Sequence, residues 1–319
     1  MSPFLDYVIT SIALGMTFLY GCTGEIITEK VGHLNLGIPG IMCIGGACGC
    51  SALTLFYDTP VDFLGIIFAI IAAFLGGAAM GLIYCFLTVT LKANQNVTGL
   101  AMTIFGAGLM KFIMSKMAVT SYEYLYAIKY FRFPFYGVKG VGALIYCGIM
   151  LFLAIAIALV AAYVLGRTRV GLHLRAVGEN PATADAVGIN VTLYKYLGTL
   201  VGSGIAALGG LYYIMDFSGS PEAYKTIESL GWLAVALVIF TLWKPHISII
   251  GSIIFGFLYL AGTRIPTLLG INLPMSATPL LKMLPYAVTV IVLIITSIRK
   301  KRENQPPASL GLPYFREER

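Results

Sequence analysis

The sequence predicts an all-α fold, a polytopic bundle of transmembrane helices. Only 11% of the 319 residues are Asp, Glu, Lys or Arg, whereas a soluble domain carries about a quarter. None of these charged residues occurs within residues 63–91, 140–166 or 196–215. Each window is long enough for the roughly 20 apolar residues that a helix needs to cross about 30 Å of hydrocarbon. A soluble core does not use so many such windows, so a soluble protein is excluded.

The apolar runs predict about nine membrane segments, with eight to ten as the range. The seventh is short because Glu228 and Lys244 bound it, and a short segment spans a bilayer with help from its neighbours. In chain order the predicted segments are 4–22, 36–56, 64–91, 97–114, 143–165, 192–214, 229–243, 247–265 and 283–298.

Basic residues near the segment ends predict the orientation, because Lys and Arg are enriched in cytoplasmic loops. If the basic run at residues 299–302 lies in the cytoplasm, the denser basic clusters lie there too. The N-terminus is then outside and the C-terminus is in the cytoplasm. The net charge of +7 is spread over short loops, which indicates anchoring in a lipid bilayer and no nucleic-acid partner. Residues 1–302 form the membrane domain. The remainder, 303–319, contains two adjacent prolines and scattered charges and is predicted to be a disordered cytoplasmic tail.

Catalytic motifs are absent from the sequence. The three histidines, His33, His173 and His246, are far apart, and none belongs to a zinc-protease motif. The chain has neither a phosphate-binding Gly-rich loop ending in Gly-Lys-Ser/Thr nor a Gly-x-Ser-x-Gly nucleophile motif. We therefore predict no enzymatic activity, no metal site and no cofactor.

The stretch CTGEIITEKVGHLNLGIPGIM, residues 22–42, interrupts two apolar runs with glycines and a proline. This pattern predicts a helix break at or near the membrane. Irregular backbone at that depth requires protein groups or a water-filled cavity to satisfy its hydrogen bonds. The polar residues Glu25, Glu29 and Asn35 lie in the predicted break. They either line a substrate route, which we favour for Asn35, or belong to a cytoplasmic turn with Glu29 in solvent.

The stretch KANQNVTG, residues 92–99, places Asn94 and Asn96 at the inner end of the fourth segment. A carboxamide both donates and accepts hydrogen bonds, so it can recognise sugar hydroxyls or the edge of a base. Capping a helix is the more frequent use of such residues.

The stretch GLHLRAVGENPATADAVGIN, residues 171–190, predicts a short polar helix. Asn180 suits the N-cap, Pro181 the first helical position and Gly188 the left-handed residue after the end. The predicted helix, 181–187, is about 10 Å long at 1.5 Å per residue. Such a rigid stub either docks into a groove of a partner protein, which we favour, or lies idle on the membrane surface.

Together these stretches resemble the membrane subunits of ATP-binding-cassette (ABC) importers, the group with the branched-chain amino acid, ribose-type sugar and nucleoside permeases. The resemblance covers about residues 5–300 and implies a multi-pass location in a bacterial plasma membrane. It implies separate ATPase subunits, a second permease subunit, identical or related, and an extracytoplasmic substrate-binding protein. It makes 1–302 the permease domain and 167–190 the loop that docks onto the ATPase, through Arg175, Gly178, Glu179, Asn180, Pro181, Ala184 and Gly188. It also implies that Gly24, Glu25, Gly32, Asn35 and Gly37 border the translocation route. We assign Asn94 and Asn96 to the same route from their carboxamide chemistry.

The first motif narrows the choice of solute. Its Gly24-Glu25 start and its Leu-Asn-Leu-Gly centre resemble nucleoside and simple-sugar permeases most. Pro39 departs from this pattern, because it stands where the pattern has an acidic residue, and it leaves the choice of solute open. A branched-chain amino acid is the alternative within the same group. A secondary transporter without ATPase partners is a different class. It requires membrane-buried acids, and the candidates are Asp6, Glu25 and Glu29, all near segment ends.

Overall fold

The computed structural model describes residues 3–54, 62–120, 148–269, 278–299 and 305–315. All regular secondary structure in these ranges is helical. Seven helices are long and apolar enough to cross a membrane, and two apolar helices, Ile38–Thr54 and Leu280–Ile295, are shorter. The predicted all-α membrane fold is confirmed, and every predicted segment coincides with a helix over its described part.

The long helices are α1 (Pro3–Lys30), α2 (Ile38–Thr54), α3 (Asp62–Cys85), α4 (Gln95–Thr120), α6 (Ile149–Arg167), α9 (Val191–Tyr212), α10 (Ile227–Phe240), α11 (Pro245–Leu269) and α13 (Leu284–Arg299). Two π-helical turns, η1 (Phe86–Thr90) and η4 (Tyr213–Ser218), extend α3 and α9. The short elements are α7 (Arg169–Glu179), α8 (Pro181–Ala186), the 3-10 helix η5 (Pro221–Thr226) and α12 (Thr278–Lys282).

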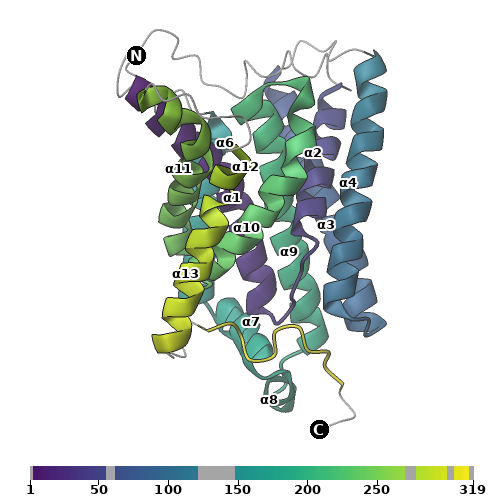
Figure 1. Ribbon diagram of the computed structural model, residues 1–319. Helices are drawn as coiled ribbons and strands as arrows, with labels where there is room; N and C mark the ends of the chain where they lie inside the picture. Colours follow the sequence, from purple (N-terminus) through teal and green to yellow (C-terminus); the bar gives the residue numbers. More distant parts are fainter. Residues whose placement is uncertain (1–2, 55–61, 121–147, 270–277, 300–304, 316–319) are drawn as a thin grey trace.

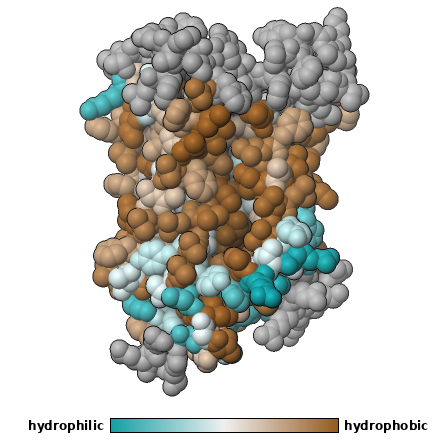
Figure 2. All heavy atoms as spheres, turned by 180° about the vertical axis from the view of Figure 1, so that it is seen from behind, coloured by the Kyte–Doolittle hydropathy of each residue, from teal (hydrophilic) through white to brown (hydrophobic). Residues whose placement is uncertain are grey.

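The long helices run side by side, and α7 and α8 lie together at one end of the bundle (Figure 1). Helix α1 packs against α9 and α11, and α2 packs against α3, α4 and α9. Of the most apolar window of α9, 72% is buried, against 33% for α3 and α6, so α9 is central and the other two are peripheral. Figure 2 shows an apolar band across the face of the bundle seen from behind, with hydrophilic residues gathered toward the end that carries α7 and α8.

The centre of the bundle depends on close contact between helix backbones. A Cβ atom on Gly24 of α1 would lie 2.3 Å from the carbonyl oxygen of Gly202 in α9. A Cβ atom on Gly45 of α2 would lie 2.1 Å from the carbonyl oxygen of Ala207, also in α9. Small residues at helix crossings allow this approach, and the resulting dispersion contacts stabilise helix pairs in a membrane.

The predicted helix break is shorter than the sequence indicated. Helix α1 continues through Gly24, Glu25 and Glu29 to Lys30, and irregular backbone is limited to residues 31–37. The prediction that Gly24, Glu25 and Glu29 lie in the break is wrong. Gly24 lies where α1 crosses α9 and allows the two backbones to approach closely. From the sequence alone, a glycine that permits close packing cannot be distinguished from one that ends a helix.

Candidate functional site

The predicted short helix is present as α8, and its termini have the predicted chemistry. The Asn180 side-chain oxygen accepts a hydrogen bond from the Thr183 amide at 3.0 Å, and Pro181 is the first helical residue. Gly188 adopts φ = +86°, a left-handed conformation that glycine reaches without a steric penalty. The helix ends at Ala186, one residue earlier than predicted.

Helix α7 precedes α8 and was not predicted. Its buried residues Gly171, Leu174 and Gly178 are three and four positions apart, and Val177 is next to Gly178, which is the pattern of one helix face. That periodicity was available in the sequence. A Cβ atom on Gly178 would lie 2.3 Å from the carbonyl oxygen of Lys30, so α7 packs tightly against the end of α1.

The predicted docking residues separate into two groups by exposure. Arg175, Glu179, Asn180 and Gly188 are exposed, and Pro181 is half-buried. Gly178 and Ala184 are buried and therefore hold the α7–α8 hairpin in place instead of facing outward. Sequence reasoning missed Val187, whose side chain is 72% exposed at the end of α8. Its position next to Gly188, the predicted left-handed residue at the end of the helix, was the signal from which its exposure could have been predicted.

The turn between α1 and α2, residues 31–37, has its backbone polar groups satisfied by side chains from other helices. The Tyr84 hydroxyl of α3 donates to the Leu34 carbonyl oxygen at 2.8 Å. The Leu34 amide donates to the Gln95 side-chain oxygen, also at 2.8 Å. Thr103 of α4 donates to the Leu36 carbonyl oxygen at 2.8 Å. Protein groups thus replace the water that irregular backbone otherwise needs.

The polar residues of the predicted route lie inside the packed chain. Glu25 and Asn35 are both 0% exposed, and the Asn35 amide donates to a Glu25 carboxylate oxygen at 3.1 Å. The Asn35 side-chain oxygen accepts from the Gly37 amide at 2.9 Å and so forms the turn. Gly32, with φ = +89°, reverses the chain after α1. Glu25, Gly32, Asn35 and Gly37 are all buried in this conformation.

Glu29 is 4% exposed and accepts a hydrogen bond from the indole N–H of Trp243. The interpretation of Glu29 as a solvent-exposed acid is wrong.

His33, in the same turn, is buried, and its Nδ1 lies 2.8 Å from the Thr199 hydroxyl. Burial, with a smaller effect of the Lys195 charge, holds the pKa of His33 well below its usual value.

Asn94 and Asn96 do not join this group. Both are exposed, and the Asn94 side-chain oxygen accepts from the amides of Asn96 and Val97 at 3.0 and 3.1 Å. Asn94 therefore caps α4, the more frequent of its two predicted uses. The neighbouring Gln95, which is 3% exposed, contacts the α1–α2 turn instead.

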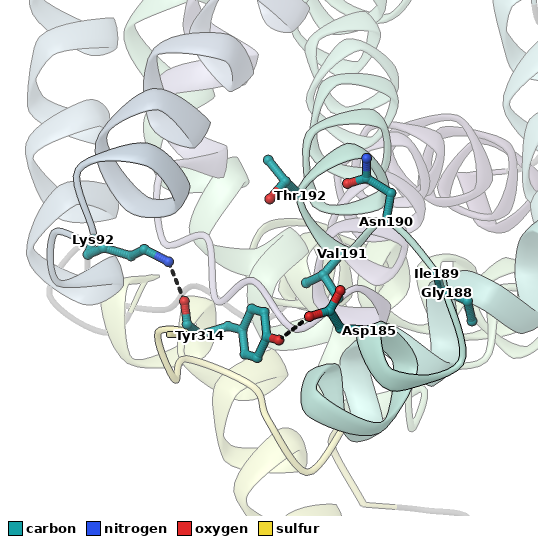
Figure 3. Close-up of a pocket in the computed structure, with 8 residues that line it drawn as sticks. All are labelled: Lys92, Asp185, Gly188, Ile189, Asn190, Val191, Thr192 and Tyr314. Atoms are coloured by element: carbon teal, nitrogen blue, oxygen red, sulfur yellow. Dashed lines mark hydrogen bonds between the residues drawn. The ribbon is translucent and has the colours of Figure 1, made fainter. Parts of the chain in front are cut away.

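The C-terminal segment packs against this end of the bundle. The prediction of a disordered tail is wrong for residues 305–315, because Ser309 is buried and its amide donates to the Gly178 carbonyl oxygen at 3.0 Å. The Tyr314 hydroxyl donates to Asp185 of α8 at 2.8 Å (Figure 3). A pocket of about 310 Å³ lies beside this contact, and it is lined by Lys92, Asp185, Gly188, Ile189, Asn190, Val191, Thr192 and Tyr314.

The family model of the branched-chain amino acid transport system, permease component, matches residues 4–293. A putative glucose ABC transporter permease, TsgC13 of Haloferax volcanii, is 31% identical over 92% of each chain. The nucleoside ABC transporter permease NupC of Lactococcus lactis is 31% identical over 91% of this chain and 92% of its own. The guanosine ABC transporter permease NupQ of Bacillus subtilis is 29% identical over 98% of each chain. The chain therefore belongs to the branched-chain amino acid transport system permease family and is a multi-pass cell-membrane subunit of an ABC transporter.

Proposed function

We propose that the chain forms the translocation path of an ATP-driven importer for a nucleoside or a monosaccharide. Relatives at about 30% identity are named for glucose, nucleosides and guanosine, and they match more than nine tenths of the chain. The family description names branched-chain amino acids, which remain the second solute class.

All nine long helices cross the bilayer in this proposal, with α7 and α8 in the cytoplasm and the start of α1 outside. The distribution of charge supports this orientation. Lys92, Arg167 and Arg169 are exposed at the end that carries α7 and α8. Basic residues near segment ends favour the cytoplasmic side.

The ATPase subunits dock on the exposed face of α8 and its flanks, formed by Arg175, Glu179, Asn180 and Gly188. The observation that carries this proposal is the capped helix at the polar end of the bundle, where Asn180 and Val187 are exposed. ATP binding draws two ATPase subunits together and displaces α8 on each of two permease subunits. An extracytoplasmic binding protein delivers the solute to the opposite end. Such a cycle requires partners that bind the two conformations with different affinity.

The group formed by Glu25, Gly32, Asn35 and Gly37 borders the route in the conformation that admits the solute. One carboxylate oxygen of Glu25 and the side-chain nitrogen of Asn35 are buried without a hydrogen-bond partner among the described residues. Buried polar atoms are rarely left in this state, so both are suited to binding water or solute when the helices separate.

Two experiments test the proposal. The chain is first purified from its native membrane in mild detergent, where a co-purifying ATPase supports an ABC importer and its consistent absence supports a secondary transporter. Uptake of radiolabelled nucleosides and sugars is then measured for Glu179→Lys with Asn180→Lys, which places two positive charges on the docking face. We expect uptake to be abolished while the protein stays in the membrane.

The matched control is Glu179→Gln with Asn180→Asp, which exchanges carboxylate and carboxamide and preserves size, net charge and helix capping. We expect this control to transport at the wild-type rate. Wild-type uptake by the double-lysine variant would exclude α8 as the docking element.

A further inference from the structure

The C-terminal segment, residues 305–315, contacts four parts of the polar end of the bundle. It contacts α7 through Gly178 and α8 through Asp185. It contacts the α1–α2 turn through Gly32, whose carbonyl oxygen accepts from the Gly311 amide at 3.3 Å. It also reaches the α3–α4 turn, where the Lys92 ammonium donates to the Tyr314 carbonyl oxygen. Apart from the consecutive helices α7 and α8, these regions are far apart in the sequence.

The contact with α7 supplies hydrogen-bond donors to a carbonyl oxygen that has no donor within the helix. Ser309 is 7% exposed, and both its amide and its hydroxyl donate to the Gly178 carbonyl oxygen, at 3.0 and 2.5 Å. Gly178 is in the last turn of α7, where carbonyl groups have no partner within the helix. The hydroxyl also lies so close to Gly32 that a Cβ atom there would approach it to 2.9 Å. Ser309 therefore fills the corner between α7 and the α1–α2 turn.

The contact with α8 runs through Tyr314, whose two polar groups have different partners. Its hydroxyl donates to Asp185, and its carbonyl oxygen accepts from Lys92 (Figure 3). The Lys92 ammonium also lies 5.1 Å from the centre of the Phe315 ring, which is within range of a cation–π interaction. Tyr314 thus joins α8 to the α3–α4 turn.

The start of α4, directly after the α3–α4 turn, is hydrogen-bonded to the α1–α2 turn. Gln95 accepts from the Leu34 amide at 2.8 Å, and its side-chain nitrogen donates to the Leu312 carbonyl oxygen at 3.4 Å. The tail, α8 and the α1–α2 turn therefore form one continuous hydrogen-bonded network.

We infer that residues 305–315 are a positioning element for energy coupling, which clamps α8 to the α1–α2 turn so that displacement of α8 reaches the membrane helices. The inference rests on the proposed function. A helix of six residues has little stability of its own. Without the tail, α8 would be attached to the bundle mainly through α7 and the start of α9. With it, α8 is also bonded to the turn that carries Asn35.

The test uses the complete importer, with its ATPase and binding protein, in proteoliposomes, where solute uptake and ATP hydrolysis are measured together. A chain ending at Asn304 lacks the clamp, and a chain ending at Phe315 retains it and serves as the control. We expect the first to transport at least about fivefold less solute per ATP hydrolysed, on the scale of one or two lost hydrogen bonds. The control should match the full chain. An unchanged or higher ratio in the chain ending at Asn304 would overturn the inference.

Point variants keep the test decisive if the shortened chain does not accumulate. Tyr314→Phe removes the hydroxyl and keeps the ring, and Asp185→Ala removes its acceptor. Because the two groups bond to each other, the double variant should lose little more coupling than either single variant. Wild-type coupling in both single variants, or additive losses, would contradict a clamp at this contact. If the lysine substitutions at 179 and 180 spare uptake, the proposed function itself fails. If they abolish it and the tail variants are neutral, the present inference alone fails.

Discussion

Replacement of Gly24 by alanine should destabilise the protein, although alanine favours a helix more than glycine does. The new Cβ atom would lie 2.3 Å from the Gly202 carbonyl oxygen, and two atoms of Ala206 would lie within 2.9 Å of it. The first contact is about 1 Å shorter than an ordinary van der Waals contact. Two of the three obstructing atoms belong to the α9 backbone, so the strain cannot be relieved by a side-chain rotation.

The size of the effect follows from two opposing contributions. Overpacking a well-packed interior costs about 1–3 kcal/mol, and a backbone contact at the centre of the bundle belongs at the upper end. Replacing glycine in a helix returns up to about 1 kcal/mol. The net loss is about 2 kcal/mol, which at roughly 2 °C per kcal/mol lowers the midpoint of thermal unfolding by about 4 °C.

The assay uses the protein's own thiols. Cys22, Cys43 and Cys50 are free and buried, so a maleimide dye that fluoresces on reaction reports unfolding as they become accessible. Gly108→Ala is the matched control, because Gly108 lies in α4 and a Cβ atom there would meet nothing within 4 Å. The control should unfold at an unchanged or slightly higher temperature. If Gly24→Ala behaved in the same way, α1 and α9 would not cross at Gly24, and the packing described above would be incorrect.

Three further predictions concern the polar end of the bundle. Asn180→Ala removes the N-cap of α8, which should lower the free energy of unfolding by about 1 kcal/mol and reduce solute uptake. Asn180→Asp retains a capping oxygen and should keep wild-type stability and uptake. Wild-type uptake by the alanine variant would refute the role of the cap. Tyr84→Phe leaves the half-buried Leu34 carbonyl oxygen without its donor and should lower the free energy of unfolding by about 1 kcal/mol. Equal stability of this variant and the exposed control Tyr163→Phe would contradict this. Because the pKa of His33 is lowered in the folded state, the unfolded chain binds more protons at this residue below about pH 6.5, and the contribution of His33 to stability should fall by up to about 1.4 kcal/mol per pH unit as the pH decreases. His33→Gln should flatten this decrease, measured as the unfolding midpoint between pH 7 and 5, and an unaltered slope would assign it to other groups.

Sequence reasoning succeeded where the signal was local. Asn180, Pro181 and Gly188 have the backbone roles predicted for them, because a cap involves atoms within a few residues of each other. It failed at Gly24, because a glycine either ends a helix or permits close packing, and only the neighbouring helix decides between these uses. Helix α7 is a different case, because its apolar periodicity was present and was overlooked.

The sequence by itself determined that this chain is an all-α membrane protein, where its apolar segments lie and that a capped stub interrupts them. Charge depletion, segment length and cap chemistry are properties of short windows, and a bilayer or a helix end responds to them directly. Only the tertiary structure decided that Glu25 and Asn35 are buried and that residues 305–315 contact the α7–α8 hairpin. Those outcomes depend on which segments approach closely enough to exclude water and to supply hydrogen-bond partners. The segments that do so are far apart in the sequence.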